Sequence, residues 1–488
     1  MRVSITMLPT ARNFIFELGK YFVLIPVVLG MLGCDASEPG TAGSNESKTG
    51  AVVQGSAQAA TVSQETMTVA PAPAKLAFPG AVGFGAGSQG GRGGKTIEVT
   101  TLADSGPGSF RACVTAEGPR VCIFRVSGVI RFTSEPPVIK KPFLTIAGET
   151  APGDGIILAH SGGATGFTPL LIKNTHDIIV RHIRSRPDLL GDIPGANDAI
   201  TIENSRDVIV DHVSGSWARD ENINGHRQND NVTISWSIFA EGLTPHDKCA
   251  LLGSDPKGPQ KFSFIGNLCA HTGDRNPDLN FTPLSCVEII NNVFYNAASQ
   301  FAEIWESYGG TSANIAGNTF RAGPNTSPSA IGIDRQEIKS TGAASVWLND
   351  NQFDGKFVEQ APSLAEIISP QPVCQLSTMP QNSVTAYDMV LKNAGTFPRD
   401  SFDMRIISEV QTRGGKIRHH AGTMPVLAAG VAYADTDSDG MSDAWENANG
   451  TKFDIADSWE DANGDGLSNL EAFLDYAHNQ KMKNQPVP

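Results

Sequence analysis

The sequence predicts an all-β protein built around a parallel β-solenoid, and three observations lead to this fold class. Short apolar runs recur in which Val and Ile alternate with polar or small residues. From the third run onward each begins 24–30 residues after the one before, and no amphipathic segment of helical length lies between them. Asn, Asp, Gly or Ser follows each run, where the chain must bend. The runs begin at Phe143, Asp177, Asp207, Asn231, Lys261, Cys286 and Ala313.

Coils of this length can bury their apolar side only against the next coil, which is typical of a solenoid. A β-sandwich, which also has regular short strands, is the alternative, and the lack of two-residue hairpin signals argues against it. The composition agrees with many short strands, since 50 of the 488 residues are Gly, 30 are Pro and only 18% are charged. The net charge of −14 argues against a nucleic-acid partner, which would need a clustered basic face.

Residues 1–34 are expected to be an export signal. Lys20 precedes the apolar run YFVLIPVVLGMLG, which ends at Cys34 and is too short for a comfortable membrane span. Because MLGC resembles a bacterial lipobox, a cell-surface lipoprotein with lipid on Cys34 and an ordinary secreted protein both stay open. Residues 35–76 are predicted to be a low-complexity linker of Ser, Gly, Ala, Thr, Gln and Pro. We expect a monomer that meets a membrane only through a lipid at Cys34.

Residues 77–425 are assigned to the solenoid. The Gly-rich stretch at its start, FPGAVGFGAGSQGGRGG, contains G-x-G-x-x-G look-alikes, but no strand precedes it and no helix follows, which favours turns over a nucleotide site. Asn291, Asn292 and Asn318 recur at strand ends and are expected to stack as an amide ladder. The segment from Ala386 has helical spacing and is expected to pack on the solenoid or to cap one end.

The seven cysteines predict disulfide bonds. If Cys34 carries lipid, an even number remains, and in an exported chain this indicates pairing. Cys113 and Cys122 bracket the short segment TAEGPRV and are predicted to pair. The other pairings stay open, and free buried thiols are the alternative. The cysteines concerned are Cys249, Cys269, Cys286 and Cys374.

Residues 432–480 are predicted to hold two calcium-binding loops with a structural role. The first, DTDSDGMSDAWE, has EF-hand spacing, with a Gly that permits the tight turn and a final Glu that binds with both oxygens. The second, DANGDGLSNLEA, has Ala472 where that Glu belongs and Glu471 one place early, so it is expected to be weaker or shortened. The predicted ligands are Asp435, Asp437, Asp439, Asp443 and Glu446 in the first loop, and Asp461, Asn463, Asp465 and Glu471 in the second.

Two acids and two bases recur at coil-length intervals in the middle of the chain. Asp198 and Asp220 are 22 residues apart, Lys248 follows after 28 more residues and Arg275 after another 27. Because parallel coils stack equivalent positions about 4.8 Å apart, residues one coil apart converge. The pattern therefore predicts a cation site beside a site that binds a carboxylate.

With these motifs in place, the chain resembles the pectate lyases of polysaccharide lyase family 1. The resemblance implies a right-handed parallel β-helix and β-elimination of α-1,4-linked polygalacturonate, an acidic plant or algal cell-wall polysaccharide, with Ca²⁺ as cofactor. EF-hand-like tails also occur on bacterial members. The matching motifs, in family order between residues 78 and 417, are FPGAVGFGAGSQGGRGG, TLADSGPGSFRACV, TIAGETAPGDGI, IIVRHIRSRPD, VIVDHVSGSWARDE, HDKCALLGSD, DRNP and AGTFPRDSFDMRI.

By this resemblance, Asp198 and Asp220 match the family's calcium ligands. Asn224 falls where members usually carry a second Asp, and Glu221 is expected to replace that charge. Abstracting the proton next to a uronate carboxylate builds negative charge on that group, which Ca²⁺ and a protein cation must neutralise. Lys248 matches the Lys that holds the substrate carboxylate.

The same resemblance assigns the remaining roles near the substrate. Arg275 matches the catalytic Arg that acts as general base, although arginine is a poor base and Asp274 beside it opposes a neutral form. A surface salt bridge between Arg275 and Asp274 is the alternative. His246 shapes the same turn as the matched Lys and is expected to contact substrate. Arg186 is predicted to bind substrate and to add positive potential.

Two departures from the family pattern reduce the positive charge of the site. Asp278 and Asn280 occupy the stretch where members usually carry a second, substrate-binding Arg, and Asn224 replaces an acidic calcium ligand. Polygalacturonate stays the expected substrate, with partly esterified pectin or another uronic-acid polymer as alternatives. Three histidines of the solenoid are interpreted as turn residues, because no two have a zinc-site spacing. They are His182, His212 and His226.

Two other functions stay open. The first is a non-catalytic, carbohydrate-binding solenoid, which the missing second Arg favours and the joint presence of Lys248 and Arg275 disfavours. The second is a glycoside hydrolase, which needs paired carboxylates about 5–9.5 Å apart. Asp220 and Glu221 are neighbours in sequence and are expected to point to opposite faces of a strand, which disfavours the hydrolase.

Overall fold

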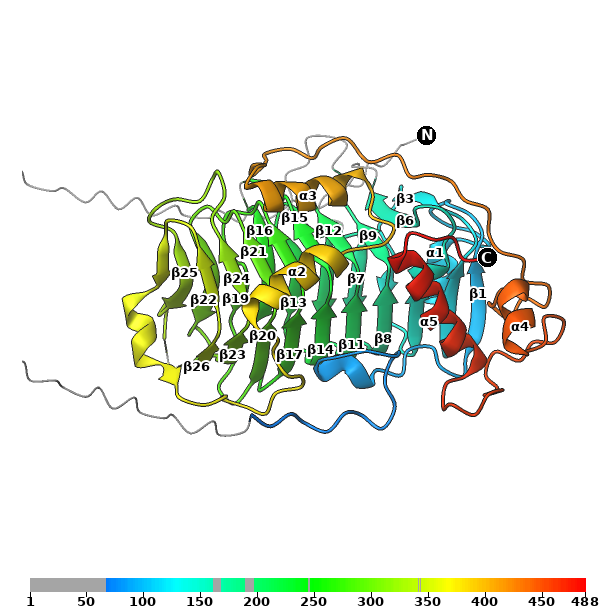
Figure 1. The fold of residues 1–488 in the computed structure, drawn as a ribbon, viewed down its shortest axis with the longest axis horizontal. Helices are drawn as coiled ribbons and strands as arrows, with labels where there is room; N and C mark the ends of the chain where they lie inside the picture. Colours follow the sequence, from blue (N-terminus) through cyan, green and yellow to red (C-terminus); the bar gives the residue numbers. More distant parts are fainter. Residues whose placement is uncertain (1–66, 161–167, 189–196, 245, 341, 343) are drawn as a thin grey trace, which may run out of the picture. The chain divides into compact units, whose positions relative to one another are not determined.

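A computed structural model describes residues 67–160, 168–188, 197–244, 246–340, 342 and 344–488, all within one compact unit of the chain. Its strands pair in parallel from each coil to the next, and they form three sheets that wind together into a β-helix (Figure 1). The predicted parallel β-solenoid is thereby confirmed. None of the described helices is long and apolar enough to cross a membrane.

The first sheet has eleven strands and the other two have nine each within the described residues. The first consists of β1 (Lys95–Val99), β2 (Arg120–Phe124), β5 (Leu144–Ala147), β8 (His176–Arg181), β11 (Arg206–Asp211), β14 (Asp230–Ser235), β17 (Lys261–Ile265), β20 (Cys286–Ile290), β23 (Ser312–Ala316), β26 (Ser345–Asn349) and β29 (Ile368–Ser369). The second consists of β4 (Val138–Ile139), β7 (Leu170–Lys173), β10 (Ile200–Glu203), β13 (Glu221–His226), β16 (Lys248–Ser254), β19 (Asp278–Leu279), β22 (Gln300–Trp305), β25 (Ile331–Gln336) and β28 (Val358–Gln360). The third consists of β3 (Gly128–Phe132), β6 (Ile156–His160), β9 (Ile183–Ser185), β12 (Ser214–Ser216), β15 (Ile238–Ala240), β18 (Leu268–Ala270), β21 (Val293–Tyr295), β24 (Thr319–Arg321) and β27 (Gln352–Asp354).

The apolar half of each run fills the inside of the coils. One row of the first sheet stacks Ile178, Val208, Val232, Phe262 and Val287 in register, and all five are fully buried. Each coil covers the apolar face of its neighbour, which is why no coil is stable by itself. The alternation that the sequence shows is therefore the alternation between the core and the outer surface.

An amide ladder runs along one corner of the coils. Asn267, Asn292, Asn318 and Asn351 occupy equivalent positions, and each accepts a hydrogen bond from a backbone N–H of the preceding coil at 2.8–3.2 Å. The ladder confirms the predicted role of Asn292 and Asn318. Asn291 lies beside it with a φ of 58°, and its side-chain amide donates instead to the carbonyls of Gly317 and Gln381.

The helices lie outside the coils. The short α1 (Phe110–Thr115) lies near the first coils, and η1 (Phe84–Gly87), η2 (Gly148–Thr150) and η3 (Pro362–Glu366) are 3-10 turns. The helical segment predicted from Ala386 forms α2 (Ser383–Asn393) and α3 (Ser401–Thr412), and both run along the side of the solenoid (Figure 1). Their apolar faces pack against solenoid residues such as Ile238, Leu268 and Val293, so they cover its flank rather than one end.

The C-terminal tail packs against the first coils. It contains α4 (Asp443–Asn449) and α5 (Asn469–Met482). Trp445, Leu470 and Phe473 form one apolar cluster with Val121 and Ile123 of β2. This apolar cluster thus holds the predicted calcium-loop segment, residues 432–480, against the solenoid. The boundaries of the segment stay predictions.

Two further expectations can be compared with the fold. Residues 67–76, which the sequence assigns to the linker, contact the rest of the fold. Ala70 donates to the carbonyl of Leu376, which follows β29, at 2.8 Å, and Lys75 pairs with Glu471 of α5 at 3.1 Å. Residues 1–66, with the export signal and Cys34, lie outside the described residues. The predicted disulfide Cys113–Cys122 is confirmed. The remaining cysteines pair as Cys249–Cys269 and Cys286–Cys374, so the alternative of free thiols is wrong for these six.

Candidate active site

The acids and bases singled out in the sequence come together where the chain enters the second sheet. The loops that lead into β10, β13, β16 and β19 carry them on consecutive coils. The register pairs Glu221 with Lys248, and the backbone N–H of Ala250 donates to the carbonyl of Arg275 at 2.9 Å. Coil stacking thus brings together residues that are 22–28 positions apart in sequence.

Carboxylate and amide oxygens from two coils converge beside Arg275. Nδ2 of Asn224 donates to Oδ2 of Asp198 at 3.1 Å and to Oε2 of Glu221 at 3.5 Å. The backbone N–H of Glu221 donates to Oδ1 of Asp198 at 3.2 Å. Oδ1 of Asn224 is buried and has no hydrogen-bond partner. Hard Ca²⁺ takes oxygen ligands, so this donor set, with its unpartnered amide oxygen, fits the expected cofactor.

Asp220 and Glu221 reach the same place, although they are neighbours in sequence. One oxygen of each carboxylate and one ring nitrogen of His246 lie within 4.8 Å of one another. His246 Nδ1 is 2.6 Å from Oδ1 of Asp220. The expectation that the two acids point to opposite faces is wrong, because Asp220 precedes β13 and the strand pleat does not orient it. The separation is also shorter than the roughly 5–9.5 Å that hydrolase carboxylates need, which still disfavours a hydrolase.

The crowded carboxylates have raised pKa values. Burial, together with the nearby carboxylate of Asp220, raises the pKa of Asp198 to about 6. Burial and the carboxylates of Asp198 and Asp220 hold the pKa of Glu221 well above its ordinary value. Like charges this close oppose joint ionisation unless a cation compensates them. The acids of this site are therefore expected to exchange protons for a bound cation.

Arg275 lies between carboxylates of its own and neighbouring coils. Its Nη1 pairs with Glu221, and its Nε is 3.5 Å from Oδ2 of Asp278. Burial by itself would lower the pKa of the guanidinium, but Glu221 and Asp278 outweigh it and raise the pKa above its ordinary value. Asp274, the alternative partner weighed from the sequence, pairs instead with Nζ of Lys248 at 2.5 Å.

Sequence reasoning missed Glu303. Its Oε1 accepts the backbone N–H of Arg275 at 2.9 Å, and its Oε2 accepts the indole N–H of Trp305 at 2.9 Å. Arg275 has a φ of 53°, an uncommon conformation for a non-glycine residue, and Glu303 holds the backbone at that point. Glu303 is the register partner of Asp278 and lies one coil length after Arg275, so the coil spacing was the signal that pointed to it.

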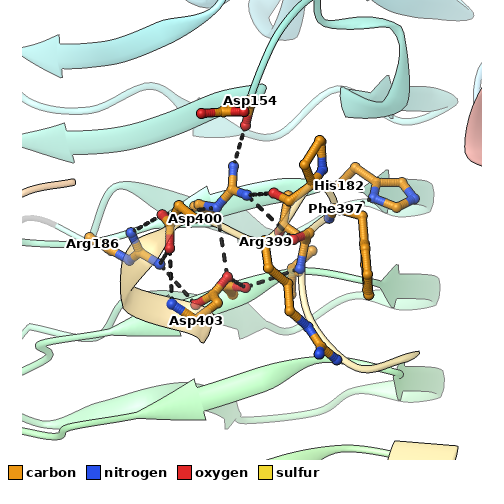
Figure 2. A network of polar contacts seen from close by, with 12 residues as sticks. Asp154, His182, Arg186, Phe397, Arg399, Asp400 and Asp403 are labelled. Atoms are coloured by element: carbon orange, nitrogen blue, oxygen red, sulfur yellow. Dashed lines mark hydrogen bonds and ion pairs between the residues drawn. The ribbon is translucent and has the colours of Figure 1, made fainter. Parts of the chain in front are cut away.

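The substrate-binding role predicted for Arg186 is wrong. Its side chain is fully buried, and Figure 2 shows it facing Asp400 and Asp403 from the segment around the start of α3. Nη1 is 2.5 Å from Oδ2 of Asp400, and Nη2 is 2.9 Å from Oδ1 of Asp403. Arg184 approaches the same two carboxylates at 3.2 and 3.7 Å. The pair of arginines fastens α3 to the solenoid, and no part of Arg186 is available to a polymer outside.

In the tail, the first predicted calcium loop gathers its carboxylates as its spacing suggests. Oxygens of Asp435, Asp437 and Asp439 lie within 4.8 Å of one another, and so do oxygens of Asp439, Glu446 and Asp457. Glu446 is fully buried, yet neither of its carboxylate oxygens has a hydrogen-bond partner. Burial and the neighbouring acids raise its pKa to about 8. Asp457 follows the twelve-residue loop, and the loop pattern does not reveal it.

Asp443 and the second loop are arranged differently. Asp443 accepts hydrogen bonds from the backbone N–H and the hydroxyl of Thr436, at 2.8 and 2.7 Å, and lies outside both groups of converging acids. In the second loop, Asp461 and Asp465 accept the loop's own backbone N–H groups, and Nδ2 of Asn463 donates to Asp465.

Glu471 is not a ligand of the second loop, which corrects the sequence prediction. Its Oε2 accepts the backbone N–H of Ser468 at 2.9 Å in a capping box at the start of α5. The same carboxylate pairs with Lys75 and Arg92. These partners turn Glu471 toward the N-terminal segment and away from the loop.

Comparison with known proteins identifies relatives of this chain. No family model matches it. The probable pectate lyase C of Aspergillus fumigatus (strain CBS 144.89 / FGSC A1163 / CEA10) is 36% identical over 393 residues, which cover 78% of this chain and 88% of that protein. The probable pectate lyase C of Emericella nidulans is 34% identical over 425 residues, covering 82% and 92%.

Two solved structures with a similar fold are more distant from this chain in sequence than the two fungal proteins are. The structure of jun a 1, the major allergen from cedar pollen, is 20% identical with a TM-score of 0.48, over 65% of this chain and 92% of that chain. Pectate lyase Bsp165PelA from Bacillus sp. N165, in complex with trigalacturonate, is 16% identical with a TM-score of 0.47, over 65% and 99%. The identity to the two fungal proteins, which exceeds 30% over most of both chains, shows that this chain belongs to the pectate lyase family.

Proposed function

We propose that this chain is a calcium-dependent polysaccharide lyase that cleaves polygalacturonate, an acidic cell-wall polymer, by β-elimination. The observation that carries the proposal is the convergence of the Asp198, Glu221 and Asn224 side chains beside Arg275 on neighbouring coils. Membership of the pectate lyase family supports the same reaction. The joint presence of Lys248 and Arg275 at this site favours an enzyme over a binding module that only holds carbohydrate.

The roles of the side chains follow from the chemistry of the substrate. In this proposal Lys248, whose Nζ pairs with Asp274 at 2.5 Å, binds a uronate carboxylate, and His246 contributes to the same subsite. Arg275 takes the proton from the carbon next to that carboxylate, after which the glycosidic oxygen leaves and a carbon–carbon double bond forms. Bound Ca²⁺ supplies positive charge that stabilises the electron-rich carboxylate of the transition state. A cation that compensates the charge of Glu221 also removes one of the main influences that raise the pKa of Arg275. A lowered pKa is what a general base requires.

The test is the ultraviolet absorbance of the unsaturated uronide product. We expect a steady increase with polygalacturonate and Ca²⁺, and no increase when a chelator is present in excess. Absence of product from polygalacturonate, pectin and alginate alike would contradict the lyase assignment and leave the carbohydrate-binding function.

A second substrate class is favoured by one observation. Where family members carry a substrate-binding Arg, this chain has Asp278, and the register continues from Asp278 to Glu303 and Asp334. Burial raises the pKa of Asp278 and of Glu303, so this row offers carboxyl groups where a free uronate would need a cation. An esterified residue has no charge there to compensate. If esterified pectin is the better substrate, its kcat/KM will exceed that of polygalacturonate under the same Ca²⁺ concentration. The reverse order would assign the chain to unesterified pectate.

Calcium affinity at the active site is expected to depend on pH. Because the pKa of Asp198 rises from its ordinary value of 3.8 to about 6, protons compete with Ca²⁺ below pH 6. The affinity is therefore expected to fall by about tenfold for each pH unit of acidification below 6, for one displaced proton. In chelator the sign is opposite: the free energy of unfolding falls as the pH rises from 3.8 to about 6, since the unfolded chain releases the Asp198 proton first.

Calcium titrations above and below pH 6, monitored by calorimetry or with a competing dye, check this pH dependence. Titration of the Asp198→Asn variant is the control, because its remaining pH dependence reports the other acids. An affinity that does not change between the two pH values would contradict the assignment of Asp198 as a ligand.

We propose that the first tail loop binds Ca²⁺ through Asp435, Asp437, Asp439 and Glu446, with Asp457 as an added ligand. The buried, unpartnered carboxylate of Glu446 supports this site, since an isolated buried charge is costly. Saturating Ca²⁺ at 100 times its dissociation constant is expected to stabilise the tail by about 2.7 kcal/mol. Melting curves with and without Ca²⁺ measure the gain.

The Glu446→Gln variant isolates that tail site. We expect this change to abolish most of the calcium-dependent gain, whereas Asp461→Asn in the second loop is expected to retain it. Equal gains in both variants would show that the first loop is not the stabilising site.

Export of the chain is also proposed. Three disulfide bonds lie in the described residues, and such bonds persist in oxidising compartments outside the cytosol. The mass of the mature N-terminal peptide distinguishes secretion from attachment to the cell surface through a lipid on Cys34. A lipid-modified Cys34 would establish the anchored form.

A further inference from the structure

Three histidines from distant parts of the chain meet where the tail helix crosses the solenoid. His182 and His212 follow β8 and β11 at equivalent positions, with a φ of 51° each, and their rings stack with centroids 5.3 Å apart. His478 comes from α5, and its Nδ1 is 2.9 Å from Nε2 of His182. One ring nitrogen of each histidine lies within 4.8 Å of the other two. The function derived above uses none of the three rings.

The surroundings bury and orient these rings. His182 and His212 lie in the interior, and the half-buried ring of His478 contacts both, with centroids 5.1 and 4.9 Å away. Nδ1 of His212 is 2.6 Å from Oδ1 of Asp211. A carboxylate on the outer nitrogen directs the other nitrogen inward and makes it a better ligand, as in carboxylate–histidine–zinc arrangements. Asp211 also pairs with Arg181, and its carboxylate thereby offsets the positive charge of that guanidinium near the rings.

We propose that His182, His212 and His478 bind one divalent transition-metal ion, Zn²⁺, and so fasten α5 to the solenoid. Three imidazoles plus a water suit tetrahedral zinc, and His478 is only half-buried. Ca²⁺ is not expected here, because it prefers oxygen ligands. The site therefore differs in chemistry from both groups of carboxylates described above.

Metal binding rearranges one hydrogen bond. The backbone N–H of Phe397 donates to Nδ1 of His182 at 3.3 Å (Figure 2), which places the proton of that ring on Nε2. That Nε2 lies 2.9 Å from Nδ1 of His478. With a metal at Nε2 the proton moves to Nδ1 and the contact with Phe397 is lost. The backbone N–H of Phe397 then needs another partner, and the bonds from three imidazoles to the metal have to outweigh that loss.

The experiment is a zinc titration of the full chain with Ca²⁺ in large excess, so that the carboxylate sites are already occupied. Stoichiometry comes from elemental analysis after gel filtration, and affinity from competition with a chromogenic chelator. We expect one equivalent of Zn²⁺ on the wild type. Co²⁺ in place of Zn²⁺ is expected to give the intense visible absorption of a tetrahedral site.

Two ligand variants and one matched control decide the outcome. His478→Gln on α5 and His212→Gln on the solenoid are both expected to weaken Zn²⁺ binding by at least roughly 100-fold, the upper end of what losing a partner of a metal-bound histidine costs. His420→Gln, which removes an exposed histidine elsewhere, is expected to bind like the wild type. Circular dichroism checks that each variant is folded.

The proposal is overturned if the wild type retains no stoichiometric Zn²⁺, or if either ligand variant binds as tightly as the control. In that case the three rings are a metal-free cluster that holds α5 by hydrogen bonding. Weakening in His478→Gln but not in His212→Gln would also overturn it, because a site that needs only the helix residue is not the three-histidine site.

Discussion

Replacing Arg275 with Lys is expected to reduce kcat on polygalacturonate by roughly 10²–10⁴-fold, the range that a positioned acid or base contributes. The guanidinium reaches Glu221 with Nη1 and Asp278 with Nε, and a single ammonium cannot occupy both positions. Lysine keeps the positive charge, so a loss of this size points to the position and proton affinity of the guanidinium rather than to its charge. The rate of product absorbance at saturating Ca²⁺ and substrate measures the effect.

Controls separate chemistry from folding in this experiment. Arg206→Lys changes an exposed arginine, paired with Asp207, by the same substitution and is expected to keep the wild-type rate. Thermal unfolding of Arg275→Lys is expected to match that of the wild type closely. If Arg275→Lys turns over at the wild-type rate, another group takes the proton and the assignment of the base is wrong.

Replacing Arg186 with Met is expected to destabilise the protein by about 3–5 kcal/mol. The change leaves Asp400 and Asp403 buried next to Arg184 with one cation where there were two. It also removes the contact of the guanidinium with the Phe402 ring, whose centroid is 4.4 Å away. Denaturant unfolding in the presence of Ca²⁺ measures the loss, and material that folds is expected to keep its KM, because Arg186 lies in the interior.

A compensated variant tests the cause. With Asp403→Asn alone added to Arg186→Met, Arg184 and Asp400 remain as one buried ion pair with no charge in excess, and part of the lost stability is expected to return. The ion pairs also predict acid sensitivity: burial opposes ionisation of Asp400, but Arg186 and Arg184 outweigh it and lower its pKa to about 2. That stability is present above pH 4, roughly, and is lost as the pH falls toward 2. A raised KM with unchanged stability would restore the substrate-binding role of Arg186.

The contrast between Arg275 and Arg186 shows where prediction from sequence succeeds. Arg275 lies one coil length from Lys248, and the spacing was enough to place both at the same edge. Arg186 lies in a motif as suggestive as any other, but its partners Asp400 and Asp403 come more than 200 residues later, on a segment predicted only to pack somewhere on the solenoid. Whether a charged side chain faces solvent or a buried partner depends on that packing.

The predicted calcium ligands divide in the same way. Asp435, Asp437 and Asp439 belong to one loop, and their alternation along the chain decides that they share a centre. Asp457 and Glu471 were misjudged, the first overlooked and the second assigned to a loop that it does not serve. In both cases the deciding contact is made with another element: Glu446 and Asp439 for Asp457, and the N-terminal Arg92 for Glu471.

By itself the sequence determined the solenoid, the coil spacing, the meeting of Asp198, Asp220, Lys248 and Arg275, and the family resemblance. It did so because stacking is local: each coil contacts the next, so a repeat of 24–30 residues specifies the neighbours. Only the tertiary structure decided that Arg186 is buried against Asp400 and Asp403, and that His478 meets two solenoid histidines. These contacts join segments with no common period, and the free energy of packing one element on another selects them.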